Sequence, residues 1–326
     1  MELPAARFAT ALAQIRPGGL RPGEPLALAV SGGPDSMAML WLAATALSGR
    51  VVAATVHHGF RPEAAEEARL VATACASLGV PHATLRPDRP ITGRNLHAAA
   101  RTARYALLGR WAVAAGARVL ATAHHADDQA ETFLMRAVRG SGPAGLAGVR
   151  ASRREGDLTI VRPLLDWRRT ELAAVAAAAG LPFVSDPSNT DDRFERTRVR
   201  RLLAEQSWLD PVGLARAARH VGEAEAALAA TADWLGRARR MTPTEADGEL
   251  WLDMTDLPRE LRRRLARDAI RTVRKAHGLM PDFDLATNIE PLLDAVKAGK
   301  AATQADVLVT PRDTIWRFSR APARRR

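Results

Sequence analysis

Short apolar runs alternate with helix-length segments over the first 180 residues, and this alternation limits the fold more than any other feature. Runs of this kind, bounded by turn residues, predict buried strands. We expect strands at 26–31, 51–56, 82–86, 118–123 and 158–164, and helices at 36–47, 62–79, 94–116, 126–138 and 168–180. Strands that alternate with helices form parallel β-α-β units. The sequence therefore predicts an α/β fold with an open, doubly wound, mostly parallel sheet and helices on both faces.

The remaining third of the chain has a different pattern of predicted helices and strands. Helical patterns at 213–240, 256–277 and 284–298 dominate it, and strand-like runs occur only at 250–254 and 305–317. A chain of 326 residues has room for two ordinary domains, or for one large domain with an appendage. We therefore predict a catalytic domain at 1–212 and a second, mainly helical domain at 213–326. The last residues, RAPARRR, are expected to form a flexible basic tail.

The charge balance indicates an acidic partner. The net charge is +11, and all but three of the 47 basic residues are arginine. Codon bias explains arginine in place of lysine, but it does not explain an excess of positive charge. A balance this basic favours nucleic acid or a membrane surface as the partner.

Cysteine usage and hydropathy indicate a compartment. Cys75 is the single cysteine, which excludes an intrachain disulfide and a cysteine metal cluster. No apolar stretch is long enough to span a membrane, and the N-terminus has acidic Glu2 and no apolar core of a signal peptide. We expect a cytoplasmic protein without a membrane anchor.

A glycine-rich turn follows the first predicted strand. It consists of Ser31, Gly32, Gly33, Pro34, Asp35 and Ser36. Its backbone N–H groups and the helix N-terminus predict a phosphate cradle. The carboxylate of Asp35 would repel phosphates unless Mg²⁺ bridges them, so we predict Asp35 as a metal ligand. The alternative is an ordinary tight turn with a helix-capping aspartate.

Two histidines and several acids follow the fourth predicted strand. His124 and His125 end the strand, and Asp128 and Glu131 share one face of the next helix. Stabilisation by the helix dipole explains one or two acids, but it does not explain the adjacent histidines. Zinc is a weaker alternative because carboxylates favour hard ions. The carboxylates can hold a cationic amine or help it lose a proton.

Three further segments are basic. His57, His58 and Arg61 close the second strand, Arg101 and Arg104 precede Tyr105 on a helix, and a D-P-S-N turn at 186–189 precedes Arg196, Arg198 and Arg200. Taken alone, each of these segments fits either a solvated basic face or a channel for phosphates.

These five segments together, in this order over residues 26–203, resemble the tRNA(Ile)-lysidine synthetase family of the PP-loop ATP pyrophosphatase superfamily. That family shows SGGxDS, V-x-H-G-L-R, N-x-x-x-x-A-R-x-x-R-Y, H-H-x-x-D-x-x-E-T and D-P-S-N followed by arginines. The resemblance implies a Rossmann-like PP-loop domain and two half-reactions. ATP adenylates the C2 oxygen of the wobble cytidine in tRNA(Ile) with a CAU anticodon. The ε-amine of free L-lysine then displaces AMP, and the resulting lysidine pairs with A instead of G.

The resemblance also implies roles for individual residues. ATP would bind at the glycine turn, Ser31, Gly32, Gly33, Pro34, Asp35 and Ser36, and catalysis would use Asp35, Asp128, Glu131 and Arg196. Lysine and cytidine would bind at His124, His125, Asp128 and Glu131. The tRNA phosphates would bind at His58, Arg61, Arg101, Arg104, Arg198 and Arg200. A helical C-terminal domain would bind tRNA, and the oligomeric state is open, with a homodimer as one expectation. The chain departs from the family pattern at His57, Phe60, His97 and Thr197.

Other functions of the superfamily fit less well. A tRNA thiolase usually needs paired cysteines, and an amidotransferase needs a glutaminase cysteine or partner, whereas this chain has Cys75 alone. A tRNA-binding protein without catalysis would not need Asp35, Asp128 and Glu131 together. We therefore predict the lysidine-forming ligase.

Overall fold

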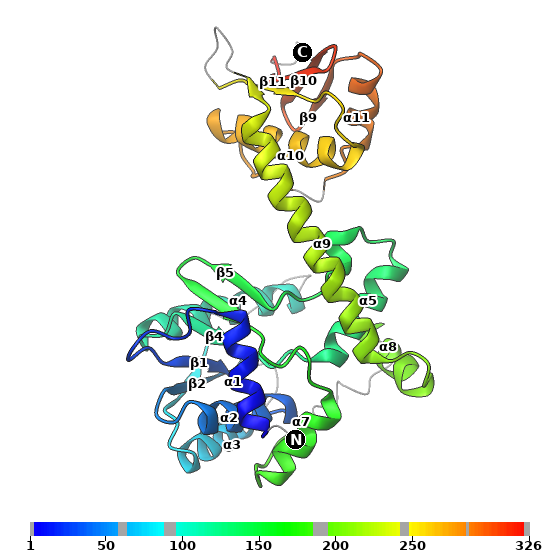
Figure 1. Cartoon of the computed structure of the whole chain (residues 1–326). Coiled ribbons are helices and arrows are strands. Elements are labelled where there is room, and N and C mark those ends of the chain that lie inside the picture. Colours follow the sequence, from blue (N-terminus) through cyan, green and yellow to red (C-terminus); the bar gives the residue numbers. More distant parts are fainter. Residues whose placement is uncertain are drawn as a thin grey trace. The chain divides into compact units, whose positions relative to one another are not determined.

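The computed structural model describes residues 3–57, 64–87, 96–184, 195–241, 248–284 and 287–322. The chain divides into two compact units, Met1–Gly222 and Glu223–Arg326 (Figure 1). The division falls inside helix α9 (Pro211–Ala238). The domain boundary predicted after residue 212 lies at the start of this helix and stays a prediction.

The first unit is built on a six-stranded sheet with the order β3-β2-β1-β4-β6-β5. Its strands are β1 (Leu26–Ala29), β2 (Val51–Val56), β3 (His82–Leu85), β4 (Val119–Ala121), β5 (Ser152–Glu155) and β6 (Leu158–Val161). All neighbouring strands are parallel except the edge pair β5 and β6. The predicted doubly wound, mostly parallel sheet is therefore confirmed.

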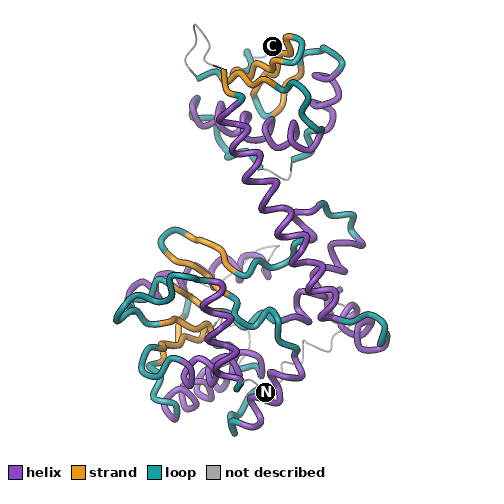
Figure 2. The backbone as a smooth tube through the Cα atoms, in the orientation of Figure 1, coloured by secondary structure: helices purple, strands orange, loops and turns teal. Residues whose placement is uncertain are grey.

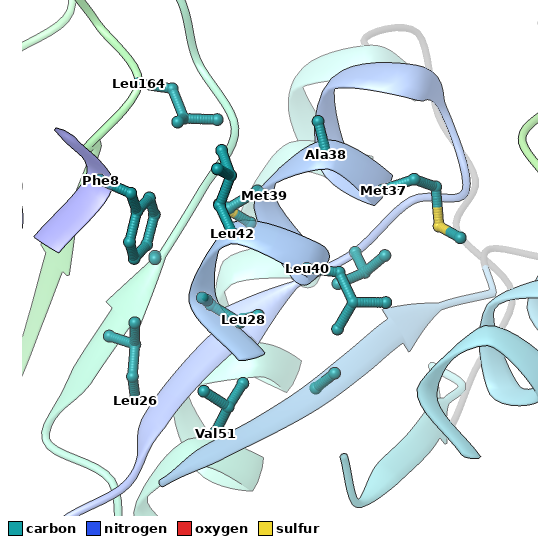
Figure 3. Packing of buried hydrophobic residues seen from close by; sticks show 14 of the residues in the cluster. Phe8, Leu26, Leu28, Met37, Ala38, Met39, Leu40, Leu42, Val51 and Leu164 are labelled. Atoms are coloured by element: carbon teal, nitrogen blue, oxygen red, sulfur yellow. The ribbon is translucent and has the colours of Figure 1, made fainter. Parts of the chain in front are cut away.

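Alternate residues of the strands β1, β2, β4 and β6 enter two separate cores. Leu26 and Leu28 of β1 join a cluster with residues of α1, α2, α3 and α7, part of which Figure 3 shows. Ala27 faces the opposite side, where Leu108 of α4 packs. The helices are α1 (Pro4–Ile15), α2 (Pro34–Ala46), α3 (Ala64–Ser77), α4 (Leu96–Ala114), α5 (Ala126–Val138), α6 (Pro143–Leu146), α7 (Arg169–Ala178) and α8 (Glu195–Glu205). Cys75 of α3 is fully buried in the first core, and burial raises the pKa of its thiol to about 12.

Strands β1 and β4 lie side by side at the point where the strand order reverses. From β1 the chain proceeds outward through β2 and β3, and it then returns to the other side of β1 as β4. Open α/β sheets bind ligands outside the carboxyl ends of their strands at such a switch point. The two most informative sequence segments follow β1 and β4, so both lie at this place.

The second unit contains a five-stranded antiparallel sheet with the order β7-β8-β11-β10-β9 (Figure 2). Its elements are β7 (Arg240–Met241), β8 (Leu250–Asp253), α10 (Arg259–Ala276), α11 (Glu290–Lys297), β9 (Ala302–Gln304), β10 (Val307–Arg312) and β11 (Ile315–Arg320). Apolar side chains of α10 and α11 pack on β8, β10 and β11 in one core. The predicted strand-like runs form β8 and the β10–β11 hairpin, and β7 and β9 extend them into a sheet.

Several predicted residues lie outside the described ranges. These are His58, Arg61, the D-P-S-N turn and the end of the basic tail. Among the described residues, no helix combines the length and apolarity needed to cross a membrane.

Gly148 and Gln129 fix the start of α5 to the chain after α6. The Gln129 side chain donates to the Val149 carbonyl at 2.7 Å and accepts from the Val149 N–H at 2.6 Å. A Cβ atom on Gly148 would lie 2.5 Å from Gln129 Oε1, and Gly148 has φ +64°. Both the backbone conformation and the close approach therefore require glycine at this position.

We expect Gly148→Ala to lower the free energy of unfolding by about 3 kcal/mol, because it strains the backbone and displaces Gln129. Gly180→Ala is the matched control. Gly180 also has φ +64°, but its Cβ would meet nothing within 4 Å, so only the backbone cost of roughly 1 kcal/mol applies. Urea unfolding measures both losses. Equal losses would contradict a contribution from the Gln129 contact.

Candidate active site

The glycine turn after β1 leaves the N-terminus of α2 open. Gly33 is the N-cap of α2 and provides no side-chain cap, and Pro34 occupies the first helical turn. The backbone N–H groups in the first turn of α2 are therefore available to an anion, which the helix dipole also favours. Gly32 has φ +89°, which favours glycine.

Hydrogen bonds within the turn hold its shape. Ser36 Oγ donates to the Gly33 carbonyl at 2.9 Å and accepts from the Ser31 N–H at 3.1 Å. The Gly32 carbonyl accepts from the Val184 N–H at 2.9 Å. This bond places the chain that precedes the D-P-S-N turn beside the glycine turn.

His125 lies at the centre of the site, between acids of both motifs. It is the N-cap of α5 and is 1% exposed. Its Nε2 lies 3.4 Å from Asp35 Oδ2 and 3.5 Å from Asp128 Oδ2, and its Nδ1 lies 3.6 Å from Asp127 Oδ2. Burial lowers the pKa of His125, but hydrogen bonds to Asp127 and Asp35 and the charge of Asp128 outweigh it and raise the pKa to about 9. The ring is therefore a cation at neutral pH, surrounded by three carboxylates.

Asp127 and Asp128 differ in their other partners. The carboxylate of Asp127 accepts from the Arg169 N–H at 2.8 Å and from the Arg168 guanidinium at 3.2 Å. Asp128 Oδ1 accepts from Arg196 Nη2 at 2.7 Å. Burial raises the pKa of Asp128, but the positive charges of His125 and Arg196 outweigh burial and lower it. Asp128 is therefore a stable anion and a weak base.

Glu131 is the most enclosed acid of the site. It is 1% exposed. It accepts hydrogen bonds from Arg196 Nε at 2.6 Å, from Arg200 Nε at 2.8 Å and from Arg169 Nη2 at 3.5 Å. These contacts give Glu131 the role of attaching α8 and the start of α7 to α5. The family resemblance implies that Glu131 is also a catalytic group near lysine, and that role stays a prediction.

His124 differs from its neighbour in charge. Its Nδ1 lies 3.0 Å from Thr122 Oγ1. Burial, together with the positive charges of Arg162, Arg101 and Arg196, lowers its pKa to about 4 against the opposing effect of Asp128. His124 is therefore neutral at physiological pH, whereas His125 is charged.

The predicted basic residues do not all meet the acids. Arg196 and Arg200 lie one helical turn apart on α8 and face Glu131, whereas Arg198 lies on the exposed side of the helix. Arg101 lies on α4, close enough to affect the pKa of His124, and Arg104 is exposed on the same helix. No sequence pattern singled out Arg168 and Arg169, which bind Asp127 and Glu131.

Asp35 fits a metal that is shared with phosphates. Its Oδ1 is buried and has no hydrogen-bond partner among the described residues. No group of three described His, Cys, Asp or Glu residues could hold a metal by itself. A free carboxylate oxygen beside a phosphate cradle is the type of ligand that a hard ion such as Mg²⁺ takes together with oxygens of a bound nucleotide.

We expect Glu131→Gln to lower the free energy of unfolding by about 2 kcal/mol, because it removes the buried carboxylate that three partly exposed guanidinium groups share as a hydrogen-bond acceptor. Urea unfolding measures the loss. Glu205→Gln on α8 is the control, since Glu205 lies exposed 3.8 Å from Arg201 and its loss should cost less than about 1 kcal/mol. Similar losses in both variants would contradict the proposed anchoring role.

The chain is similar to known proteins over most of its length. The model of the PP-loop domain family matches residues 4–207. The chain is 43% identical to a tRNA(Ile)-lysidine synthase of Zymomonas mobilis, over 92% of this chain and 90% of that protein. It is also 43% identical to a tRNA(Ile)-lysidine synthase of Novosphingobium aromaticivorans, over 94% of this chain and 92% of that protein.

A solved structure shares the fold. The U34-tRNA thiolase NcsA of Methanococcus maripaludis aligns with a TM-score of 0.54 at 17% identity, over 67% of this chain and 75% of that one. At this identity the likeness shows the fold alone. The family match and the two relatives show more: the chain belongs to the tRNA(Ile)-lysidine synthase family and carries its PP-loop domain.

Proposed function

We propose that the protein is an ATP-dependent ligase that converts the wobble cytidine of tRNA(Ile) with a CAU anticodon to lysidine. One observation carries the proposal. Asp35 of the glycine turn and Asp128 of the histidine–carboxylate segment lie 3.4 and 3.5 Å from the same His125 nitrogen. The nucleotide-binding motif and the acids therefore form one site at the switch point of the sheet, which is where such folds bind ligands.

In the first half-reaction the cytidine C2 oxygen attacks the α-phosphorus of ATP, and pyrophosphate leaves. The open N–H groups of the glycine turn would bind the phosphates, and Asp35 would hold Mg²⁺, which neutralises the charge that develops on them. His125 positions Asp35 relative to Asp128 through its two contacts. The chain thus supplies orientation and electrostatic stabilisation.

In the second half-reaction the lysine ε-amine attacks C2, and AMP leaves with the former C2 oxygen. Free lysine arrives as an ammonium ion. Because its pKa is lowered, Asp128 is better suited to bind this cation than to remove its proton. Arg196 already binds Asp128, and its side chain is 44% exposed. The ammonium would therefore share the carboxylate with Arg196 or displace it.

The RNA would bind through arginines around this site. Arg101, Arg104 and Arg198 are the described residues that we assign to phosphates, and the second unit would bind other parts of the tRNA. The target base must leave its stack to reach the carboxyl edge of the sheet. A cytoplasmic location and a homodimer stay predictions.

We expect Asp35→Asn to reduce tRNA-dependent ATP–pyrophosphate exchange by about 100-fold or more, because the amide binds Mg²⁺ poorly. Its affinity for tRNA should stay within about threefold, since Asp35 does not contact the RNA backbone in this proposal. Glu205→Gln removes one negative charge from an exposed position near the end of α8 and should retain exchange. A large loss of tRNA binding by Asp35→Asn would argue against the metal–phosphate role.

Incorporation of labelled lysine tests the whole proposal. Two unmodified transcripts with CAU anticodons, one tRNA(Ile) and one tRNA(Met), are incubated with protein, ATP and Mg²⁺. We expect ATP-dependent label in the tRNA(Ile) transcript alone. An intact protein that binds tRNA(Ile) but labels neither transcript would disprove the lysidine assignment.

A further inference from the structure

Three arginines surround Tyr105 on the α4 face of the sheet, and we call these four residues the Tyr105 cluster. The guanidinium carbons of Arg101 and Arg153 lie 5.2 and 5.0 Å from the ring centroid. Burial lowers the pKa of the Arg162 guanidinium, and the nearby Tyr105 side chain opposes that effect. One aromatic side chain thus lies beside three cations, which come from α4, from β5 and from the residue after β6.

The topology explains how these residues meet. Arg153 of β5 pairs with Ile160 of β6, and Ile160 belongs to the core under α4, so both face α4. Arg162 directly follows β6 and is 2% exposed. It donates to the Arg150 carbonyl at 2.6 Å, and its Nε is buried without a partner among the described residues. Arg101 reaches the ring from α4.

The cluster carries excess positive charge. Among the described residues, Arg153 forms an ion pair with Glu155, and Arg101 and Arg162 form none. Both side chains of the Arg153–Glu155 pair are about half exposed. An exposed pair of this kind is a weak interaction. Three guanidinium groups around one ring repel each other, and a bound anion would relieve that repulsion.

Two arginines of the Tyr105 cluster lie close enough to the active site to affect one of its side chains. Arg101 and Arg162 are near enough to His124 to help lower its pKa. The proposed ATP phosphates lie elsewhere, at the turn after β1. An anion at the Tyr105 cluster would therefore be a second one, next to the histidine–carboxylate segment.

We propose that the Tyr105 cluster binds a backbone phosphate of the anticodon loop beside the target nucleotide, with Arg101 and Arg153 as direct contacts and Arg162 as their buried support. This inference rests on the proposed function for the identity of the RNA. Guanidinium groups bind phosphates through paired N–H donors, and the stacked ring holds both in position before the RNA arrives. The inference assigns a role in substrate binding to the β5–β6 hairpin.

Arg153→Ala and Arg154→Ala form a matched pair for testing it. The two residues are adjacent and exposed, but Arg154 faces away from Tyr105 and donates to the Gly156 carbonyl. The probe is a labelled anticodon stem–loop of tRNA(Ile), titrated by fluorescence anisotropy between 50 and 200 mM salt. We expect Arg153→Ala to weaken binding roughly tenfold. Arg153→Ala should also reduce the slope of log affinity against log salt concentration by about one. Arg154→Ala should change the affinity and the slope only slightly.

Equal losses in the two variants would overturn the proposal, because they would indicate a general effect of surface charge. Unchanged binding by Arg153→Ala would overturn it as well. Lysine incorporation by the wild-type protein separates the two proposals. If the wild type modifies tRNA(Ile) and Arg153→Ala binds the stem–loop normally, the cluster proposal fails alone. If the wild type modifies no tRNA but Arg153→Ala selectively loses RNA affinity, the ligase proposal fails and the phosphate site stands.

Discussion

The buried carboxylate of Glu131 binds guanidinium groups from two other helical segments, and the geometry of the active site depends on this interaction. A buried ion costs several kcal/mol unless it is paired, so α5 cannot bury Glu131 without Arg169, Arg196 and Arg200 around it. The same arginine, Arg196, binds Asp128 one turn earlier on α5. The acid that holds the helices together therefore also fixes the position of the acid that we assign to lysine.

His125 extends this network to the nucleotide side. Its imidazolium lies between Asp35, which follows β1, and Asp127 and Asp128, which follow β4. Without a cation at this place, three carboxylates would face each other in a poorly solvated region. The two half-reactions that we propose require ATP and lysine to be bound close together, and the charged histidine allows the acids that we assign to them to be neighbours. His124 stays neutral beside the arginines, so the two histidines contribute different charges.

Five of the six strands of the first unit followed from the sequence, because the buried strands are short apolar runs, whereas helices α1 and α6 were not expected. The meeting of Asp35 and Asp128 followed as well, since carboxyl ends of parallel strands share one edge of the sheet. Strand β5 was missed because its residues, Ser152–Glu155, are polar and exposed on both faces of an edge strand. Arg162 and Arg168 were missed for a different reason. In a chain whose basic residues are nearly all arginine, composition does not distinguish a buried ligand from a solvated side chain, and only the fold does.

The environment of Cys75 has a practical consequence. A thiol that is both inaccessible and protonated at neutral pH does not react with alkylating probes while the protein is folded. Because it is the single cysteine of the chain, the wild-type protein already provides an unreactive background for labelling. A cysteine introduced on the surface of each unit could carry a donor and an acceptor fluorophore without removal of the native residue. Energy transfer between the dyes would then follow how the two units respond when tRNA binds.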